Sequence, residues 1–364
     1  MSKVPADWLS GKVSDFLVLQ RGFDLTKKQA LNGNIPVYSS SGLAYYHNEA
    51  KVKGPGVITG RKGSVGPVYF VEEDFWPHDT TLWVKDFKGN LPEYVKIFLH
   101  SMELSKYDEA SSVPTLNRNN VHCVRCAFPP LPEQTKIVQI LSTWDKAIAT
   151  TEKLIGNSQQ QKKALMQSLL TGKKRLPGFE GEWSETLLGD IAYITTGNSN
   201  RQDSNLDGNY AFFDRSEDVR TSNIYLFDCE AVIVPGEGQD FVPKYFHGKF
   251  DLHQRTYAIM NINGCDAKFI FFAISYFRGY LLSQAVGSTV KSLRLPMFKK
   301  MPLVLPPLPE QQKIAAVLTA ADNEIELLQK KLAFLKQEKA ALMQQLLTGK
   351  RRVKINPTEE CMDA

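Results

Sequence analysis

A short glycine-flanked segment, residues 59–64, carries side chains suited to holding a polar ligand. It reads Thr-Gly-Arg-Lys-Gly-Ser, with two cations between glycines that allow the backbone a close approach to a surface. Arginine and lysine contact phosphate or guanine, and small hydroxyls contact phosphate. We expect Arg61, Lys62 and Ser64 to contact DNA; the alternative is a solvated basic turn.

Other clusters of reactive residues are weaker candidates. His122 lies beside Cys123 and Cys126, but structural zinc needs about four ligands, and no second pair follows. No metal site is therefore expected. His78 and His253 recur at one position of an internal repeat, and we favour a structural histidine over a DNA contact. Glu49 and Lys51 resemble only the end of a nuclease motif.

The sequence also lacks the motifs of the common nucleotide and methyl-transfer sites. It has no G-x-x-x-x-G-K-[ST] loop for ATP and no convincing G-x-G-x-x-G after a strand. It has no Asn-Pro-Pro-[Phe/Tyr] run of the kind that amino-methyltransferases use. We therefore expect neither catalytic residues nor a cofactor in this chain.

Composition is that of an ordinary globular protein with a mild positive charge. The chain has 364 residues, 43% hydrophobic residues and a formal net charge of +5, which permits an acidic partner without requiring one. Five cysteines do not make a disulfide scaffold, which favours a reducing cytoplasm. The most apolar stretch, residues 269–282, is too short to span a bilayer. We expect a cytoplasmic protein that does not engage a membrane.

The elements that must position these residues come from a duplication. PPLPEQTKI at 129–137 returns as PPLPEQQKI at 306–314, and ALMQSLLTGKKR at 164–175 returns as ALMQQLLTGKRR at 341–352. Weaker matches align the front parts, with Trp8 over Trp183. Such repeats fix an architecture, and this one predicts two similar halves related by a pseudo-two-fold axis.

The repeated tails predict two long helices with a coiled-coil seam. Apolar residues recur at alternating steps of three and four, and the seam positions include Ile137, Leu141, Trp144 and Ile148 in the first tail, and Ile314, Leu318, Ile325, Leu332 and Leu342 in the second. Pro132 and Pro309 suit a first turn, and Gly172 and Gly349 suit the residue after a helix. Each helix should have roughly 38 residues, or ~57 Å.

Four polar residues interrupt this seam: Thr151, Ser158, Lys162 and Lys339. Polar seam residues either fix register and partner or are tolerated between well-packed ends. The basic clusters at 173–175 and 350–352 follow the helices. They would face DNA or a partner subunit, or complement the helix C-terminal dipole.

Each tail follows a globular part of mixed α/β (α+β) character. Residues 56–59 and 68–71 read as strands, and residues 93–104 and 268–282 read as helices. We predict domains at 1–127 and 178–304, helical repeats at 128–177 and 305–355, and a tail at 356–364. If the second helix packs antiparallel on the first, it returns to the first domain. Two related domains at a fixed spacing can then read two half-sites on one duplex.

Alignment of the halves supplies further candidate DNA contacts. Residues 235–240 lie over the basic loop but have lost both cations, so Gln239 should read bases, with Glu237 accepting from a cytosine amino group. Residues 214–216 lie over 39–41. The remaining candidates are Ser39, Ser41 and Tyr45 in the first domain, and Arg215, Ser216, Lys244, Lys291 and Arg294 in the second.

The repeated motifs carry a family resemblance. The two PPLPEQ-x-K-I starts, the two ALMQ-x-LLTGK ends and the restart at Gly178, Phe179 and Trp183 resemble the specificity subunit of type I restriction–modification enzymes. The resemblance covers residues 8–355. It implies two target-recognition domains that read the halves of a split site, and an antiparallel coiled coil that docks two methyltransferase subunits.

The resemblance further implies that chemistry belongs to the partners. S-adenosylmethionine would bind the methyltransferase subunits, and ATP and Mg²⁺ would serve the partner subunits, among them the motor–nuclease subunits needed for cleavage. This chain would bind double-stranded DNA without catalysing a reaction. Two alternatives remain at this point: a self-contained DNA methyltransferase or nuclease, and a coiled-coil adaptor that binds only proteins.

Overall fold

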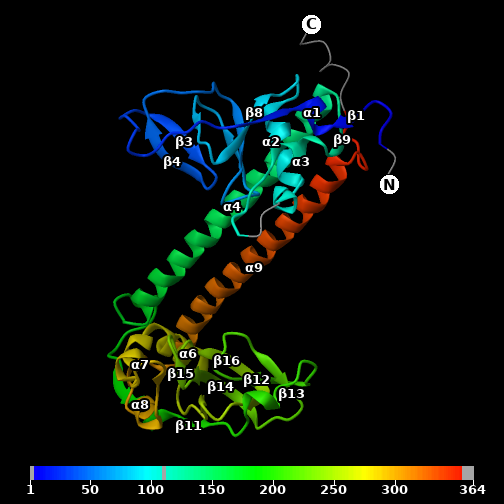
Figure 1. Ribbon diagram of the computed structural model, residues 1–364. Helices are drawn as coiled ribbons and strands as arrows, with labels where there is room; N and C mark the ends of the chain where they lie inside the picture. The colour runs from blue at the N-terminus through cyan, green and yellow to red at the C-terminus, as the bar shows by residue number, and fades with distance from the viewer. Residues whose placement is uncertain (1–3, 109–111, 355–364) are drawn as a thin grey trace. The chain divides into compact units, whose positions relative to one another are not determined.

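The computed structural model describes residues 4–108 and 112–354, and the chain forms two compact units. The first unit comprises residues 1–151 and 331–364, and the second comprises residues 152–330. Each unit combines a globular domain with part of each of two long helices (Figure 1). The first unit is therefore discontinuous in sequence. The predicted tail, 356–364, lies outside the described residues.

The first domain is built on a four-stranded antiparallel sheet with the order β2-β8-β5-β6. A three-stranded sheet, β4-β3-β7, and a ribbon of β1 and β9 complete it. Helix α2 packs against this domain's core through Tyr94 and Leu99, which are both fully buried. The elements are β1 (Leu9–Lys12), α1 (Val13–Phe16), β2 (Val18–Arg21), β3 (Ile35–Ser39), β4 (Gly42–His47), β5 (Gly56–Gly60), β6 (Val68–Val71), β7 (Trp76–Pro77), β8 (Thr81–Asp86), α2 (Pro92–Ser101), η1 (Leu104–Tyr107), α3 (Arg118–His122) and β9 (Arg125–Phe128).

The second domain has a six-stranded sheet with the order β11-β17-β14-β16-β12-β13. Helix α6 covers it, and Asp266 caps this helix by accepting from the Phe269 amide at 2.8 Å. The elements are β10 (Ser184–Leu187), α5 (Leu188–Ile191), β11 (Tyr193–Thr196), η2 (Arg201–Asp203), β12 (Tyr210–Phe213), β13 (Arg220–Ser222), β14 (Phe227–Pro235), β15 (Glu237–Gly238), β16 (Lys244–Leu252), β17 (Thr256–Met260), α6 (Ala267–Tyr276), α7 (Arg278–Gln284), β18 (Lys291–Ser292), α8 (Leu295–Lys299) and β19 (Pro302–Leu305).

The two sheets repeat one another down to their register. Gly60 of β5 pairs with Thr81 of β8, and Pro235 of β14 pairs with Thr256 of β17, which is the same offset in both strands. The ribbon β1-β9 likewise has its counterpart in β10-β19. The domains differ where β12 joins the main sheet beside β16, whereas β3 lies in a separate sheet. The duplication read from the sequence is thus a duplication of the fold.

The two tails form long helices, α4 (Leu131–Leu169, 39 residues) and α9 (Leu308–Leu347, 40 residues). Each begins one residue before its proline. Gly172 and Gly349 have φ of +68° and +69°, the left-handed conformation that ends a helix, as the sequence predicts.

Within each unit the two helices run antiparallel. In the first unit, Asp145 of α4 pairs with Lys339 of α9 at 2.5 Å. In the second, Lys162, further along α4, pairs with Asp322, earlier in α9. As residue numbers rise along one helix, those of its neighbour fall. These findings confirm the predicted fold class.

Two predicted helices differ from those observed. The stretch 268–282 is divided between α6 and α7 at Phe277, which lies outside both, and the stretch 93–104 ends earlier, at Ser101. The sequence does not mark these breaks with proline, so periodicity alone continued through them. Within residues 4–108 and 112–354, no helix is long and apolar enough to cross a membrane.

Candidate nucleic-acid interface

In the first domain, the loop after β5 meets two other polar segments. The Arg61 amide donates to the Thr80 carbonyl at 2.8 Å, and the Ser40 amide donates to the Thr80 hydroxyl at 3.3 Å. The same hydroxyl lies 3.0 Å from His78 Nδ1. Three predicted candidates, residues 39–41, residues 60–64 and His78, are therefore parts of one loop cluster. His78 has structural contacts here, in agreement with its favoured interpretation.

The two cations of this cluster have different surroundings. Arg61 is half-buried, and its Nε donates to the Asp79 carbonyl at 3.2 Å. Lys62 is exposed and makes no ion pair with any described residue. Arg21, which sequence reasoning overlooked, reaches the same place and pairs with the Asp79 carboxylate at 2.8 Å. Lys62 is thus the cation with the greatest freedom to meet a phosphate.

A further segment, residues 113–118, borders this loop and was not among the sequence candidates. The Leu116 amide donates to the Arg61 carbonyl at 2.7 Å, and the Gly63 amide donates to the Pro114 carbonyl at 2.9 Å. These bonds set Thr115 beside Lys62. The sequence did hold a signal, because Thr115-Leu116 falls over Ser292-Leu293 at the repeat offset of the tails.

The second domain builds the same frame. The Gly236 amide donates to the Arg255 carbonyl at 2.8 Å, and the Leu293 amide donates to the Gly236 carbonyl at 2.8 Å. Glu237 pairs with Ser292 in the ribbon of β15 and β18. Gly236 therefore takes the place of Arg61, and Glu237 takes the place of Lys62. The two loops are equivalent in backbone and opposite in side-chain charge.

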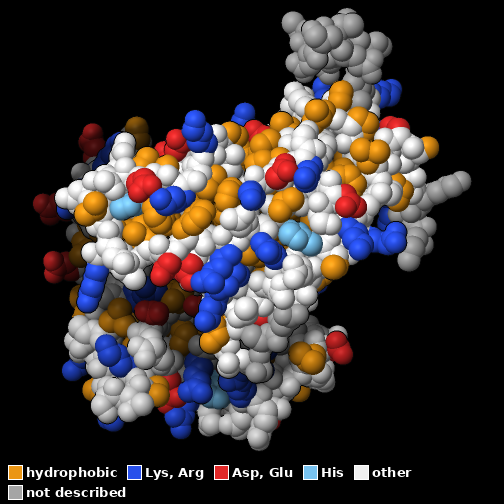
Figure 2. Space-filling model, turned by 45° about the horizontal axis from the view of Figure 1, so that its top comes forward, with side chains coloured by type: hydrophobic (Ala, Val, Ile, Leu, Met, Phe, Trp, Pro, Cys, Tyr) orange, Lys and Arg blue, Asp and Glu red, His pale blue; other side chains and the backbone are white. Residues whose placement is uncertain are grey.

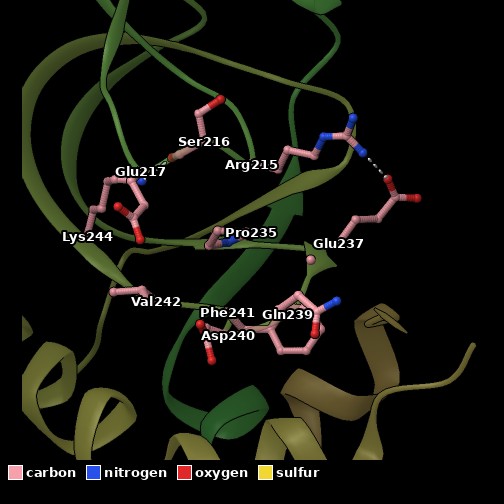
Figure 3. Close-up of a pocket in the computed structure, with 11 residues that line it drawn as sticks. Arg215, Ser216, Glu217, Pro235, Glu237, Gln239, Asp240, Phe241, Val242 and Lys244 are labelled. Atoms are coloured by element: carbon pink, nitrogen blue, oxygen red, sulfur yellow. Dashed lines mark hydrogen bonds and ion pairs between the residues drawn. The ribbon is translucent and has the colours of Figure 1, made fainter. Parts of the chain in front are cut away.

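A hollow of about 380 Å³ lies beside this second loop (Figure 3). Four predicted DNA-binding residues line it: Arg215, Ser216, Gln239 and Lys244. Lys244 is partly withdrawn, because its Nζ donates to the Ser216 carbonyl at 2.7 Å and burial lowers its pKa. Gln239 is exposed and can reach a ligand.

Glu237 does not match the prediction that it is a free acceptor. One of its oxygens is bound by Arg255 and the other lies 3.7 Å from Arg215 Nη1. Figure 3 shows the Arg215 side chain pointing toward this carboxylate. Arg255 was missed by sequence reasoning because its counterpart, Thr80, carries no charge.

The remaining DNA candidates are spread around the clusters. Ser39 Oγ lies 3.1 Å from Ser41 Oγ, and Ser64 is exposed. Lys291 and Arg294 are exposed on the segment that borders the Gly236 loop. Tyr45 is different, because it is half-buried and its hydroxyl donates to the Leu25 carbonyl. Tyr45 therefore serves the packing of β4.

The cysteine and histidine candidates have structural roles. His122 Nε2 accepts from the Leu19 amide at 2.9 Å, and burial raises the pKa of Cys126 to about 12. Among the described residues, one group places three metal-capable side chains close together, Asp24, His78 and Asp79. Asp79 already pairs there with Arg21 and His78.

The basic residues that end the helices have a role that none of the three interpretations anticipated. Arg352 binds Glu133, at the start of α4, with Nε–Oε1 and Nη2–Oε2 distances of 2.8 and 2.9 Å. Arg175 binds Glu310, at the start of α9, with both distances at 2.6 Å. Each glutamate is at most 1% exposed. The end of each repeat is therefore fastened to the start of the other.

The predicted seam residues vary in burial. Ile137, Leu141, Ile314 and Leu318 are buried near the domains. The others are half-buried: Trp144, Ile148, Ile325, Leu332 and Leu342. The seam is thus tight beside each domain and looser away from it.

Basic side chains form no single stripe on the face shown in Figure 2. They occur there in several groups, with acidic and hydrophobic side chains between them. This distribution agrees with the mild net charge of +5. Local loops, rather than an extended basic surface, are therefore the features that distinguish the two domains.

A duplicated chain with equivalent polar loop clusters on two domains, and helices fastened end to start, defines a two-domain recognition protein. Comparison with known proteins supplies the family. A model described as "Type I restriction modification DNA specificity domain" matches residues 5–157 and 180–337. The chain therefore belongs to the family of type I restriction–modification specificity subunits.

Individual relatives agree with this assignment. The type I restriction enzyme MjaVIII specificity subunit of Methanocaldococcus jannaschii is 22% identical, over 97% of this chain and 95% of its own length. The S subunit structure from M. genitalium has a TM-score of 0.69 at 14% identity and covers 95% of this chain and 97% of that one. A chain from a study of complex assembly in the type I R-M system has a TM-score of 0.61 at 16% identity, covering 96% and 100%. The structural likenesses establish the fold.

Proposed function

We propose that each domain reads one half of a split DNA target through its loop cluster, and that the two helices set the spacing between the halves. One observation carries this proposal: the same backbone frame presents different side chains in the two domains. Direct readout depends on which donors and acceptors meet the base edges. Two frames with different side chains would prefer two different sequences.

The chain would supply recognition and leave chemistry to its partners. In this scheme two methyltransferase subunits dock on the helical repeats, flip an adenine and methylate it with S-adenosylmethionine. Motor–nuclease subunits, with ATP and Mg²⁺, would join for cleavage. The family assignment and the absence of nucleotide-binding and methyltransferase motifs from the sequence support this division of labour.

Binding selection on random duplex DNA tests the proposal. The full chain, assembled with its methyltransferase subunits, should enrich one motif made of two short specified blocks separated by a fixed number of unspecified base pairs. Enrichment of a single continuous block would contradict the split-site reading. No enrichment at all would favour the protein-only adaptor.

Methylation assays separate the remaining alternative. The purified chain alone should transfer no methyl group from S-adenosylmethionine and cut no DNA, whereas the assembled complex should methylate the selected sequence. Activity of the chain alone would overturn the assignment of chemistry to its partners.

A further inference from the structure

We propose that Arg215 and Arg255 together read a guanine, and that Glu237 is the positioning residue that holds both arginines. This inference rests on the proposed function and names a base in the half-site of the second domain. It also replaces the sequence-based expectation that Glu237 itself reads a cytosine.

The three side chains form a fork with an acid at its centre. The Glu237 side chain is 16% exposed, whereas those of Arg215 and Arg255 are 53% and 62% exposed. Arg255 binds Oε1 of the glutamate, and Arg215 faces Oε2 at 3.7 Å. The acid is thus set into the surface, and both guanidinium groups extend from it toward solvent. Each arginine retains N–H donors beyond those directed at Glu237.

The backbone on both sides of the fork is also fixed. Arg255 donates its amide to His253 Nδ1 at 3.1 Å, and its carbonyl accepts from the Gly236 amide. Beside Arg215, the Ser216 amide donates to Asp214 Oδ1 at 2.7 Å, and Asp214 is only 3% exposed. Arginines held in place lose less freedom when they bind, because their ordering has already occurred.

The central carboxylate distinguishes a base contact from a phosphate contact. A phosphate is attracted by net positive charge, and a neighbouring carboxylate weakens that attraction. Reading a guanine requires direction instead, because N–H donors must reach O6 and N7 in the plane of the base. An acid that aims two arginines while reducing their net charge therefore suits guanine better than phosphate.

The first domain lacks this device at the equivalent positions. Ser40, Thr80 and Lys62 stand where the second domain has Arg215, Arg255 and Glu237. Two short hydroxyls and one lysine cannot form the fork. The inferred guanine contact therefore belongs to one half of the target and makes the halves distinguishable.

The experiment is binding selection with the complex of full chain and methyltransferase subunits, comparing wild type with Glu237→Gln. Wild type should select a split motif with guanine in one half. Glu237→Gln should reduce the preference for that guanine about fivefold or more, within the range for one bidentate base contact. The other half should stay unchanged. Glu230→Gln, on the same strand β14, is the matched control and should select the wild-type motif.

Two further measurements keep the outcome decisive. Arg255→Lys keeps the exposed charge but loses the fork, and should reproduce the loss of guanine preference. A selected duplex carrying 7-deazaguanine at that position, which lacks the N7 acceptor, should bind wild type more weakly and Glu237→Gln about as well as the normal duplex.

Several results would overturn the inference. A split motif without guanine in either half, or one that Glu237→Gln leaves unchanged, would overturn it while leaving the proposed function in place. Equal weakening on all sequences, with a smaller salt dependence, would show that the arginines bind phosphate instead. Absence of any split motif from wild type would overturn the proposed function and this inference together.

Discussion

The two domains share a backbone frame but carry opposite charge at its centre. In the first domain, Lys62 is exposed beside short hydroxyls, whereas in the second, Glu237 is set between two arginines. The hydrogen bonds that shape the two loops join equivalent backbone groups, and such bonds do not depend on side-chain identity. The comparison shows how a duplicated fold can keep its geometry while its surface chemistry changes.

The helix ends also differ in how completely their buried acids are satisfied. Glu133 accepts from Trp8 Nε1 at 3.0 Å as well as from Arg352, which in turn binds Asp7. Glu310 is bound by Arg175, and the equivalent Trp183 Nε1 has no hydrogen-bond partner among the described residues. The second fastening thus depends on fewer groups than the first.

Removal of Arg175 should have the largest effect on stability. Arg175→Ala leaves the Glu310 carboxylate buried without its cation, and we expect a loss of about 3 kcal/mol in the free energy of unfolding. Arg352→Ala should cost less, because Trp8 still donates to Glu133. Urea denaturation followed by circular dichroism measures both. Equal losses would contradict the difference between the two fastenings.

Removal of the two cations of the first loop should weaken DNA binding and its salt dependence. For Arg61→Ala combined with Lys62→Ala, we expect the slope of log affinity against log salt to become shallower by about 2 if both contact phosphate. Lys27→Ala with Lys28→Ala, an exposed pair elsewhere in this domain, is the control. An unchanged slope in the loop variant would exclude a phosphate-binding role.

The first domain should respond to acid through His122. Burial lowers the pKa of His122 below its ordinary value of 6.5, and the neutral ring accepts from the Leu19 amide. Its contribution is therefore present above pH 6.5 and is lost as the pH falls through the folded pKa. His122→Gln should flatten part of the pH dependence of unfolding below pH 6.5. The exposed His247→Gln should leave that dependence as in wild type.

The paired charges between the helices should give the smallest effect. Lys339→Glu places a second acid beside Asp145, and we expect a loss of about 0.5–1 kcal/mol, since the pair is partly exposed. Addition of Asp145→Lys to this variant should restore the wild-type free energy of unfolding. Lys162 and Asp322, the equivalent pair, provide the parallel experiment in the second unit. Failure of the double variant to recover would exclude direct pairing.

The architecture was accessible from the sequence because the repeat and its heptads are local patterns. The motifs at 129–137 and 306–314 gave the duplication, and the steps between apolar residues gave helices within two residues of their observed length. The break at Phe277 was not accessible, because the apolar pattern continues through it. The seam lysines are half-buried and paired, a detail that needs both helices in place.

The site was only partly accessible, for a physical reason. Loops that carry glycine and charge announce themselves, so residues 60–64 and 235–240 were found. The companions of these loops come from distant segments, and nothing near Arg255 in sequence signals that it meets Glu237. The same is true of Arg175 and Arg352, whose partners lie 135 and 219 residues away. Tyr45 was misjudged because an aromatic residue in a polar stretch looks exposed until its hydroxyl finds a carbonyl.

The discontinuity of the first unit has a consequence for synthesis on the ribosome. Its core includes Leu346, which is 1% exposed and packs with residues of the N-terminal domain. The second unit needs only residues 152–330. Because chains emerge from the N-terminus, the unit that is translated later has all of its parts first. The opening domain must wait, with part of its apolar surface uncovered, until the last helix has left the exit tunnel.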